Sequence, residues 1–253
     1  MGRQRIDITG REWGESRSFP RHETTEKSYD LDSAHKAFNE AVLDYCLEIV
    51  STSGEDQNRR RLAFWGTLAL MRCVGSSPAA AASALRNRLS GDLEKLGEQV
   101  FDDDEAESID VEPASGLEAQ SSLEKLIEQA DRLAKSKDPK LLAVIDVLKP
   151  LIAEAANPVV FCRFIATAEQ VAEGLRKAFP KVRVEAVTGA LPAEERRARV
   201  EDMGTAPQRL LVATDCLSEG INLQNQFDSV VHYDLSWNPT RHQIGRASCR
   251  ERV

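Results

Sequence analysis

The chain has 253 residues, 42% of them hydrophobic and 29% charged, a composition that excludes disorder throughout and fits a globular protein. Its net charge of −8 argues against indiscriminate electrostatic attachment to nucleic acid but is compatible with a local basic groove. No apolar run approaches the roughly 20 residues that would span a bilayer, and the N-terminus lacks a signal-peptide pattern, so we expect a soluble, cytoplasmic protein without a membrane partner.

The first part of the chain predicts helices. Apolar residues recur at spacings of three and four over residues 33–50, which places them on one face of an amphipathic helix. A second helix is expected over about residues 58–73. A third is expected to start at Ser77-Pro78, because serine caps helices and proline suits the first helical turn. Residues 1–100 are therefore predicted to form a mainly helical region.

An acidic stretch follows these helices. Residues 102–112 contain seven Asp and Glu residues and neither Lys nor Arg, and a proline follows at position 113. Such a charge run next to a helix breaker is typical of a solvated segment. We predict a linker over residues 101–122 and place the domain boundary there.

The pattern changes to alternating strands and helices in the region predicted as one domain, residues 123–243. Helical spacing covers residues 123–133 and 141–152, and Thr167 and Gln170 form a capping-box pattern ahead of a further helix. Another helix is expected over residues 191–203. Short apolar runs predict four strands, at residues 159–162, 182–186, 210–213 and 229–233. This alternation predicts an α/β fold with a parallel sheet, whose ligands gather at the carboxyl ends of the strands.

The loops at those carboxyl ends are rich in hydroxyls, amides and glycines. They comprise residues 163–164, 188–190, 214–224 and 234–240. Threonine hydroxyls and glycine amides are suitable donors to phosphate oxygens. By themselves the loops predict only a phosphate-containing ligand, and the plain alternative is that Thr and Gly simply turn the chain after each strand.

Taken in order, however, the loops resemble the second motor lobe of superfamily 2 helicases, particularly the Swi/Snf-related bacterial branch. Residues 159–164 (VVFCRF) resemble the fourth motif, residues 213–224 (ATDCLSEGINLQ) the fifth, and residues 232–242 the segment that leads into the sixth. The resemblance covers about residues 140–243. It implies a RecA-like sheet of the P-loop NTPase type, preceded by a mainly helical connector.

The resemblance also implies roles for individual residues. Three of them lie where the family contacts the nucleic-acid backbone: Thr188, Gly189 and Thr214. Three lie where the fifth motif faces ATP between the lobes: Glu219, Gly220 and Asn222. One loop that touches both ligands would couple a change at the nucleotide to a shift on the nucleic acid.

Parts of a complete motor are missing from this sequence. It contains no Gly-x-x-x-x-Gly-Lys-[Ser/Thr] phosphate loop, and residues 104–107 (DEAE) do not end a buried strand as the family's Asp-Glu box does. The five cysteines are scattered singly, without metal-ligand spacing, and predict no metal site. We therefore expect a fragment that binds neither ATP nor Mg²⁺ by itself, whereas the intact parent protein would use both and pair this lobe with a first RecA-like lobe.

The sixth motif breaks off. The family continues after Arg241-His242 with Gln-Arg-x-Gly-Arg-x-x-Arg, whose arginines neutralise charge on the transferring phosphoryl group, but the only comparable residue here is Arg246. Residues 244–253 match one reading frame of a common sequencing adapter. Our hypothesis is that this segment is an assembly artefact. The alternative is a degenerate sixth motif in which Arg246 is misplaced, so no complete catalytic residue is assigned.

Two functional interpretations remain open from the sequence. The first is a fragment of an ATP-dependent nucleic-acid helicase or translocase, for which the Swi/Snf resemblance modestly favours DNA over RNA. The alternative is a stand-alone RecA-like binding or regulatory module without catalysis.

Overall fold

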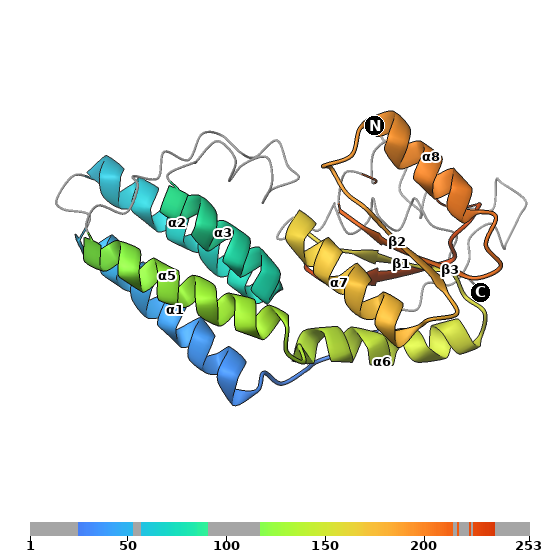
Figure 1. Ribbon diagram of the computed structural model, residues 1–253, viewed down its shortest axis with the longest axis horizontal. Coiled ribbons are helices and arrows are strands. Elements are labelled where there is room, and N and C mark those ends of the chain that lie inside the picture. Colours follow the sequence, from blue (N-terminus) through green and yellow to red (C-terminus); the bar gives the residue numbers. More distant parts are fainter. Residues whose placement is uncertain are drawn as a thin grey trace, which may run out of the picture.

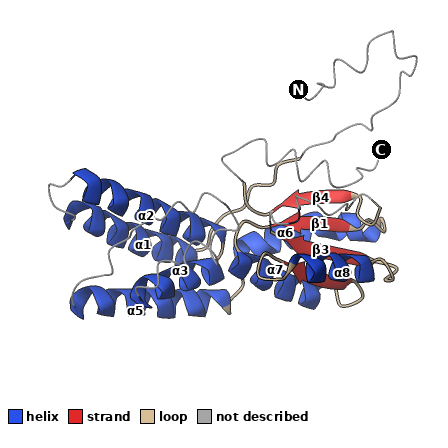
Figure 2. Cartoon of the chain, turned by 90° about the horizontal axis from the view of Figure 1, so that it is seen from above, coloured by secondary structure: helices blue, strands red, loops and turns tan. Residues whose placement is uncertain are grey.

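The computed structural model describes residues 25–52, 57–90, 117–214, 217, 223 and 225–235. These residues form two units that lie side by side, one helical and one built on a sheet (Figures 1 and 2). Among the described helices, none is long and apolar enough to cross a membrane. The predictions for residues 1–24, 91–116 and 236–253 lie outside the described residues.

Four helices form the helical unit: α1 (Ser33–Thr52), α2 (Gln57–Ser76), α3 (Pro78–Ser90) and α5 (Leu117–Ala134). The three helices predicted before the acidic stretch are confirmed, with ends extended by a few residues. The carboxylate of Asp32 accepts a hydrogen bond from the His35 amide at 2.8 Å and so caps α1. The Ser77 hydroxyl accepts one from the Ala80 amide at 3.1 Å, which confirms Ser77 as the cap of α3.

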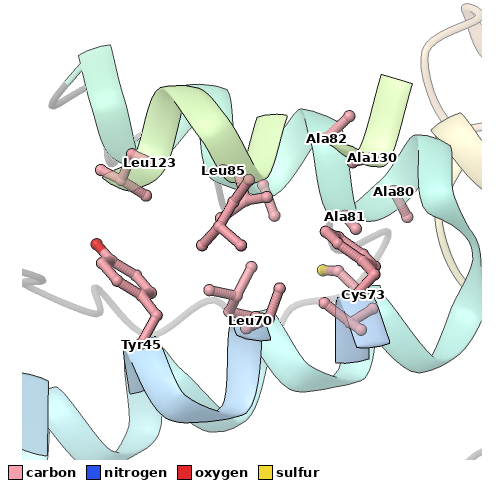
Figure 3. Close-up of a cluster of buried hydrophobic side chains, with 14 of the residues drawn as sticks. Tyr45, Leu70, Cys73, Ala80, Ala81, Ala82, Leu85, Leu123 and Ala130 are labelled. Carbon is pink, nitrogen blue, oxygen red and sulfur yellow. The ribbon is translucent and has the colours of Figure 1, made fainter. Parts of the chain in front are cut away.

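The core of the helical unit combines large apolar side chains from all four helices with a group of alanines on α3. Figure 3 shows Leu70 and Leu85 pointing toward one another across this core, both almost fully buried. Small side chains on α3, among them Ala82, lie in the same cluster as Ala130 and Leu123 of α5, which allows the two helices to approach closely. Because α5 begins at Leu117, the last six residues of the expected linker 101–122 are helical. The buried side chains of α5 belong to the core of the helical unit and not to the cores on either face of the sheet.

The second unit is a parallel sheet between helices, as predicted. Its elements are α6 (Pro139–Ala153), β1 (Pro158–Phe161), α7 (Ile165–Ala178), β2 (Arg183–Val187), α8 (Ala193–Met203), β3 (Arg209–Ala213) and β4 (Ser229–His232). All strand pairs are parallel, in the order β2-β3-β1-β4. In the central strands, neighbouring residues enter different cores: Val160 and Val212 pack under α6 and α7, whereas Val159 and Leu211 pack under α8. Burial on both faces explains why these strands read as continuous apolar runs.

The predicted capping box of α7 is wrong. The helix begins at Ile165, and its N-cap Phe164 makes no side-chain capping bond, so Thr167 and Gln170 lie inside the helix. Both side chains contact the helical unit instead. The Thr167 hydroxyl lies 2.8 Å from the hydroxyl of Ser77, and the Gln170 carbonyl oxygen accepts from the Ala79 amide at 3.0 Å. Thr167 and Gln170 thus connect the α/β unit to the helical unit, a role that their spacing in the sequence does not reveal.

Candidate functional site

The carboxyl ends of all four strands meet at one edge of the sheet. Ala213 at the end of β3 pairs with Val187 of β2 and Phe161 of β1, and Phe161 also pairs with His232 of β4. The loops that follow these strands therefore leave the sheet from the same edge. The predicted convergence of the hydroxyl- and glycine-bearing loops is confirmed for their described residues.

Thr188, Gly189 and Thr214 lie together at this edge but differ in exposure. Thr214 is fully buried and Thr188 nearly so, whereas Gly189 is exposed. The Thr214 hydroxyl accepts a hydrogen bond from the Gly189 amide at 3.3 Å, and the Leu191 amide donates to the Thr188 carbonyl at 3.2 Å. Thr214 therefore holds the 188–190 turn in shape, and Gly189 presents it at the surface. The predicted contacts of Thr188, Gly189 and Thr214 with a nucleic-acid backbone stay predictions.

The residues predicted to face ATP, Glu219, Gly220 and Asn222, and the doubtful Arg246 lie outside the described residues, so their roles stay predictions. The described residues nearest to this segment are Leu217 and Leu223, both fully buried in the core under α8. Each of these leucines anchors its part of the fifth-motif segment to the sheet.

Asp234, directly after β4, joins three elements at this edge. One carboxylate oxygen lies 2.7 Å from the ammonium nitrogen of Lys140 at the start of α6. The other accepts hydrogen bonds from the Ser76 hydroxyl at 2.8 Å and from the Arg163 amide at 3.0 Å. The side chains of Asp234 and Lys140 are only 9% and 12% exposed. The pair is therefore a largely desolvated and fully bonded ion pair, which ties the β1–α7 turn to the helical unit.

Lys140 completes this joint from the α6 side. Its ammonium group also donates to the backbone carbonyls of Gly75 and Ser76 at 3.1 and 3.2 Å and lies 4.3 Å from the centre of the Tyr233 ring. The sequence placed Asp234 in a carboxyl-end loop but carried no signal for its partner, because Lys140 is 94 residues away and ordinary in its local context. Sequence reasoning therefore missed this pair.

A second buried carboxylate, Asp138, fixes the start of α6. It accepts from the Lys140 amide at 2.9 Å as the helix cap, and from Gln170 and the Tyr233 hydroxyl at 3.4 and 3.5 Å. Burial raises the pKa of Tyr233 well above its ordinary value, and nearby Asp138 acts in the same direction. Tyr233 thus remains a neutral donor at physiological pH.

Two described carboxylates near this edge already have partners. Asp138 and Asp234 are both engaged by the contacts described above. Within the described part of the chain, no group of three or more His, Cys, Asp or Glu side chains could hold a metal.

Comparison with known proteins points to helicases. Residues 139–250 match the Helicase conserved C-terminal domain. The chain is 33% identical over 109 residues to ATP-dependent RNA helicase dbp8 of Aspergillus niger, covering 42% of this chain and 20% of that protein. It is 34% identical over 90 residues to ATP-dependent RNA helicase eIF4A of Saccharomyces cerevisiae, covering 35% and 22%. The matched regions thus span about a fifth of the length of these relatives.

Solved structures show the same fold. The helicase domain of Pyrococcus furiosus Hef aligns with a TM-score of 0.53 at 14% identity, covering 87% of this chain and 51% of that one. The C-terminal part of the Fun30 ATPase domain aligns with a TM-score of 0.51 at 14% identity, covering 88% and 78%. The family match and the shared fold together support a helicase C-terminal lobe for the α/β unit, with the predicted RecA-like sheet. The family match runs to residue 250, and the artefact hypothesis for residues 244–253 stays a prediction.

Proposed function

We propose that this chain supplies the second motor lobe of an ATP-dependent nucleic-acid helicase or translocase of the Swi/Snf-related kind. In this proposal the carboxyl edge of the sheet binds the backbone of a nucleic-acid strand. The same edge closes on ATP, which a first RecA-like lobe holds together with Mg²⁺.

The exposed Gly189 turn, held by the buried Thr214, is the observation that carries the proposal. Gly189 allows a phosphate to approach the backbone closely because it has no side chain, and Thr214 keeps the turn in place. Thr214 also begins the segment that contains Glu219, Gly220 and Asn222. A ligand-induced shift of that segment would therefore be passed directly to the Gly189 turn.

The chain by itself should not hydrolyse ATP. Phosphoryl transfer requires a phosphate-binding loop and a carboxylate that holds the metal, and the sequence contains no phosphate-loop motif. We expect no Mg²⁺-dependent phosphate release from the purified chain. ATP hydrolysis that increases with the folded fraction of the protein would contradict the proposal that a separate first lobe holds ATP and Mg²⁺.

Thr214 offers an isosteric test of binding at the edge. Thr214→Val keeps the buried volume but removes the acceptor of the Gly189 amide, whereas Thr214→Ser keeps the hydroxyl. Loss of one hydrogen bond is worth about 1 kcal/mol, so Thr214→Val should weaken binding of a fluorescent single-stranded oligomer about fivefold in an anisotropy titration. Thr214→Ser should bind as the unchanged chain does. Equal binding by all three proteins would remove the turn from the proposed interface.

Titrations with DNA and RNA oligomers of the same length and sequence test whether the edge binds DNA or RNA. The Swi/Snf resemblance favours DNA, whereas the curated relatives are named as RNA helicases. Tighter binding of one oligomer in the same titration identifies the preferred strand. Absence of binding to both would favour the alternative of a stand-alone RecA-like module.

A further inference from the structure

The first nine residues of α2 place basic and aromatic side chains on the surface of the helical unit. Arg60 and Arg61 are exposed, and the side chains of Phe64 and Trp65 are 52% and 47% exposed. The two rings meet edge to face, with their centres 5.9 Å apart. Large aromatic side chains are usually much more buried, so two adjacent exposed rings require an explanation.

These four residues form two pairs along the helix, each of one arginine and one aromatic residue. Arg60 and Phe64 are four residues apart, as are Arg61 and Trp65, and residues at this spacing are neighbours on a helix surface. Each ring therefore follows an arginine by about one helical turn. Positive charge beside stacking platforms is the combination that binds single-stranded nucleic acid, because phosphates are neutralised while bases stack on the rings.

A solvated helix end is the plain alternative, and two observations count against it. Arginine is disfavoured near a helix N-terminus, where the helix dipole is positive, and the first turn of α2 carries no acidic residue to offset it. Some other exposed arginines form ion pairs, such as Arg86 with Asp131 and Arg199 with Glu195, the latter at 2.7 Å. Among the described residues, no carboxylate forms an ion pair with Arg60 or Arg61. Within the described part of the chain, Arg60 and Arg61 thus carry positive charge without an ion-pair partner.

The rings are not needed for the core either. The buried face of α2 carries Leu70, Cys73 and Val74, which pack against the other helices of the unit. Phe64 and Trp65 are not part of that cluster. Their exposure is a feature of the outer surface rather than a consequence of packing.

We propose that Arg60, Arg61, Phe64 and Trp65, here called the α2 face, form a binding surface for single-stranded nucleic acid. The arginines contact phosphates and the rings stack on bases, which makes binding tolerant of sequence. The proposal rests on the proposed function in that the chain acts on a nucleic-acid strand, but it concerns a second surface. At 1.5 Å per residue, Arg60 is about 24 Å along α2 from Ser76, where the helix meets the α/β unit (Figure 1).

The test is an anisotropy titration of the full chain with 15-nucleotide oligo-U and oligo-dT at several salt concentrations. Arg60→Gln/Arg61→Gln should reduce the slope of log affinity against log salt by about 1.4, which corresponds to two phosphate contacts on a single strand. Trp65→Ala should weaken binding about fivefold or more, through lost stacking. Arg86→Gln is the matched control, because its guanidinium is already paired with Asp131, and it should leave the slope unchanged.

Tryptophan fluorescence supplies a direct readout of stacking. In a Trp13→Phe/Trp237→Phe background, the emission of Trp65 should be quenched by either oligomer, and Phe64→Ala should reduce the quenching. The RNA and DNA arms show which strand the α2 face prefers.

The outcomes separate this inference from the proposed function. Binding that falls with Thr214→Val but not with the α2 variants overturns the α2 face and leaves the edge intact. Binding that falls only with the α2 variants supports the α2 face and contradicts the proposed edge. If the salt slope of Arg60→Gln/Arg61→Gln equals that of Arg86→Gln, the α2 face is overturned. It is also overturned if the unchanged chain binds neither oligomer.

Discussion

At the scale of single residues, the Asp234 carboxylate has three partners on three different elements: the Lys140 ammonium, the Ser76 hydroxyl and the Arg163 amide. Ion pairs of this kind are costly to break, because the remaining partner stays desolvated and uncompensated. Ion pairs on open surface contribute little, because water and salt screen them. The chain contains one ion pair of each kind: the Asp234–Lys140 pair is largely buried, and the Asp146–Lys149 pair on α6 is exposed.

Asp234→Asn should destabilise the chain by about 3 kcal/mol, because it leaves the Lys140 ammonium without a counter-charge in a site that is only 12% exposed. Asp146→Asn should cost less than about 1 kcal/mol, since both members of its pair are more than half exposed. Urea unfolding followed by circular dichroism measures both changes. A similar loss in the two variants would mean that the Asp234 pair is solvated in solution.

At the scale of elements, periodicity predicts which segments form helices and strands but not which surface each one covers. The apolar stripe of α5 could cover a sheet or a helix equally well, and it was expected to belong with the sheet. The alanines of α3 decide its place, because they form a flat surface that leucines such as Leu123 can approach closely. This depends on the shape of a partner helix and cannot be read from the spacing within α5.

Ala81 tests that explanation. Its side chain is fully buried in the cluster that α3 shares with α5 and the other helices, and Ala81→Leu should cost about 1 to 3 kcal/mol because the added atoms overpack that cluster. Ser83→Leu is the control on the same helix, since Ser83 is partly exposed and leucine has a higher helix propensity than serine. Thermal unfolding of both variants gives the comparison. If Ser83→Leu were the more damaging of the two, close packing of α3 would not be what positions α5.

The candidate site was predictable to the extent that it depends on strand order. Parallel strands bring Thr188 and Thr214 to one edge whatever the details of packing, so their proximity followed from the alternating pattern. The burial of Thr214 did not follow, because it depends on where the 188–190 turn folds back. Asp234 and Lys140 were missed since their contact closes a loop of 94 residues, for which one sequence has no local signal.

At the scale of the whole molecule, the helical and α/β units are joined mainly through polar contacts at one corner. Thr167 on α7 is fully buried there, and its hydroxyl lies 2.8 Å from the hydroxyls of both Ser76 and Ser77. Phe164 adds an apolar contact, because it packs into the core of the helical unit. Hydrogen bonds that span two packed units make their unfolding cooperative, so the loss of one bond should weaken the coupling as well as the total stability.

Thr167→Val separates these two effects, because valine preserves the buried volume but leaves the hydroxyls of Ser76 and Ser77 without their shared partner. Hydrogen exchange in increasing urea, read by mass spectrometry, follows peptides from α1 to α3 and from the sheet strands separately. In the unchanged chain both sets should open together. In Thr167→Val the helical peptides should open at lower urea than the strands. Thr205→Val, at an exposed turn, should keep the two sets together. An equal shift of both sets in Thr167→Val would show that Thr167 adds stability without linking the units, and the link would then rest on Phe164 and Asp234.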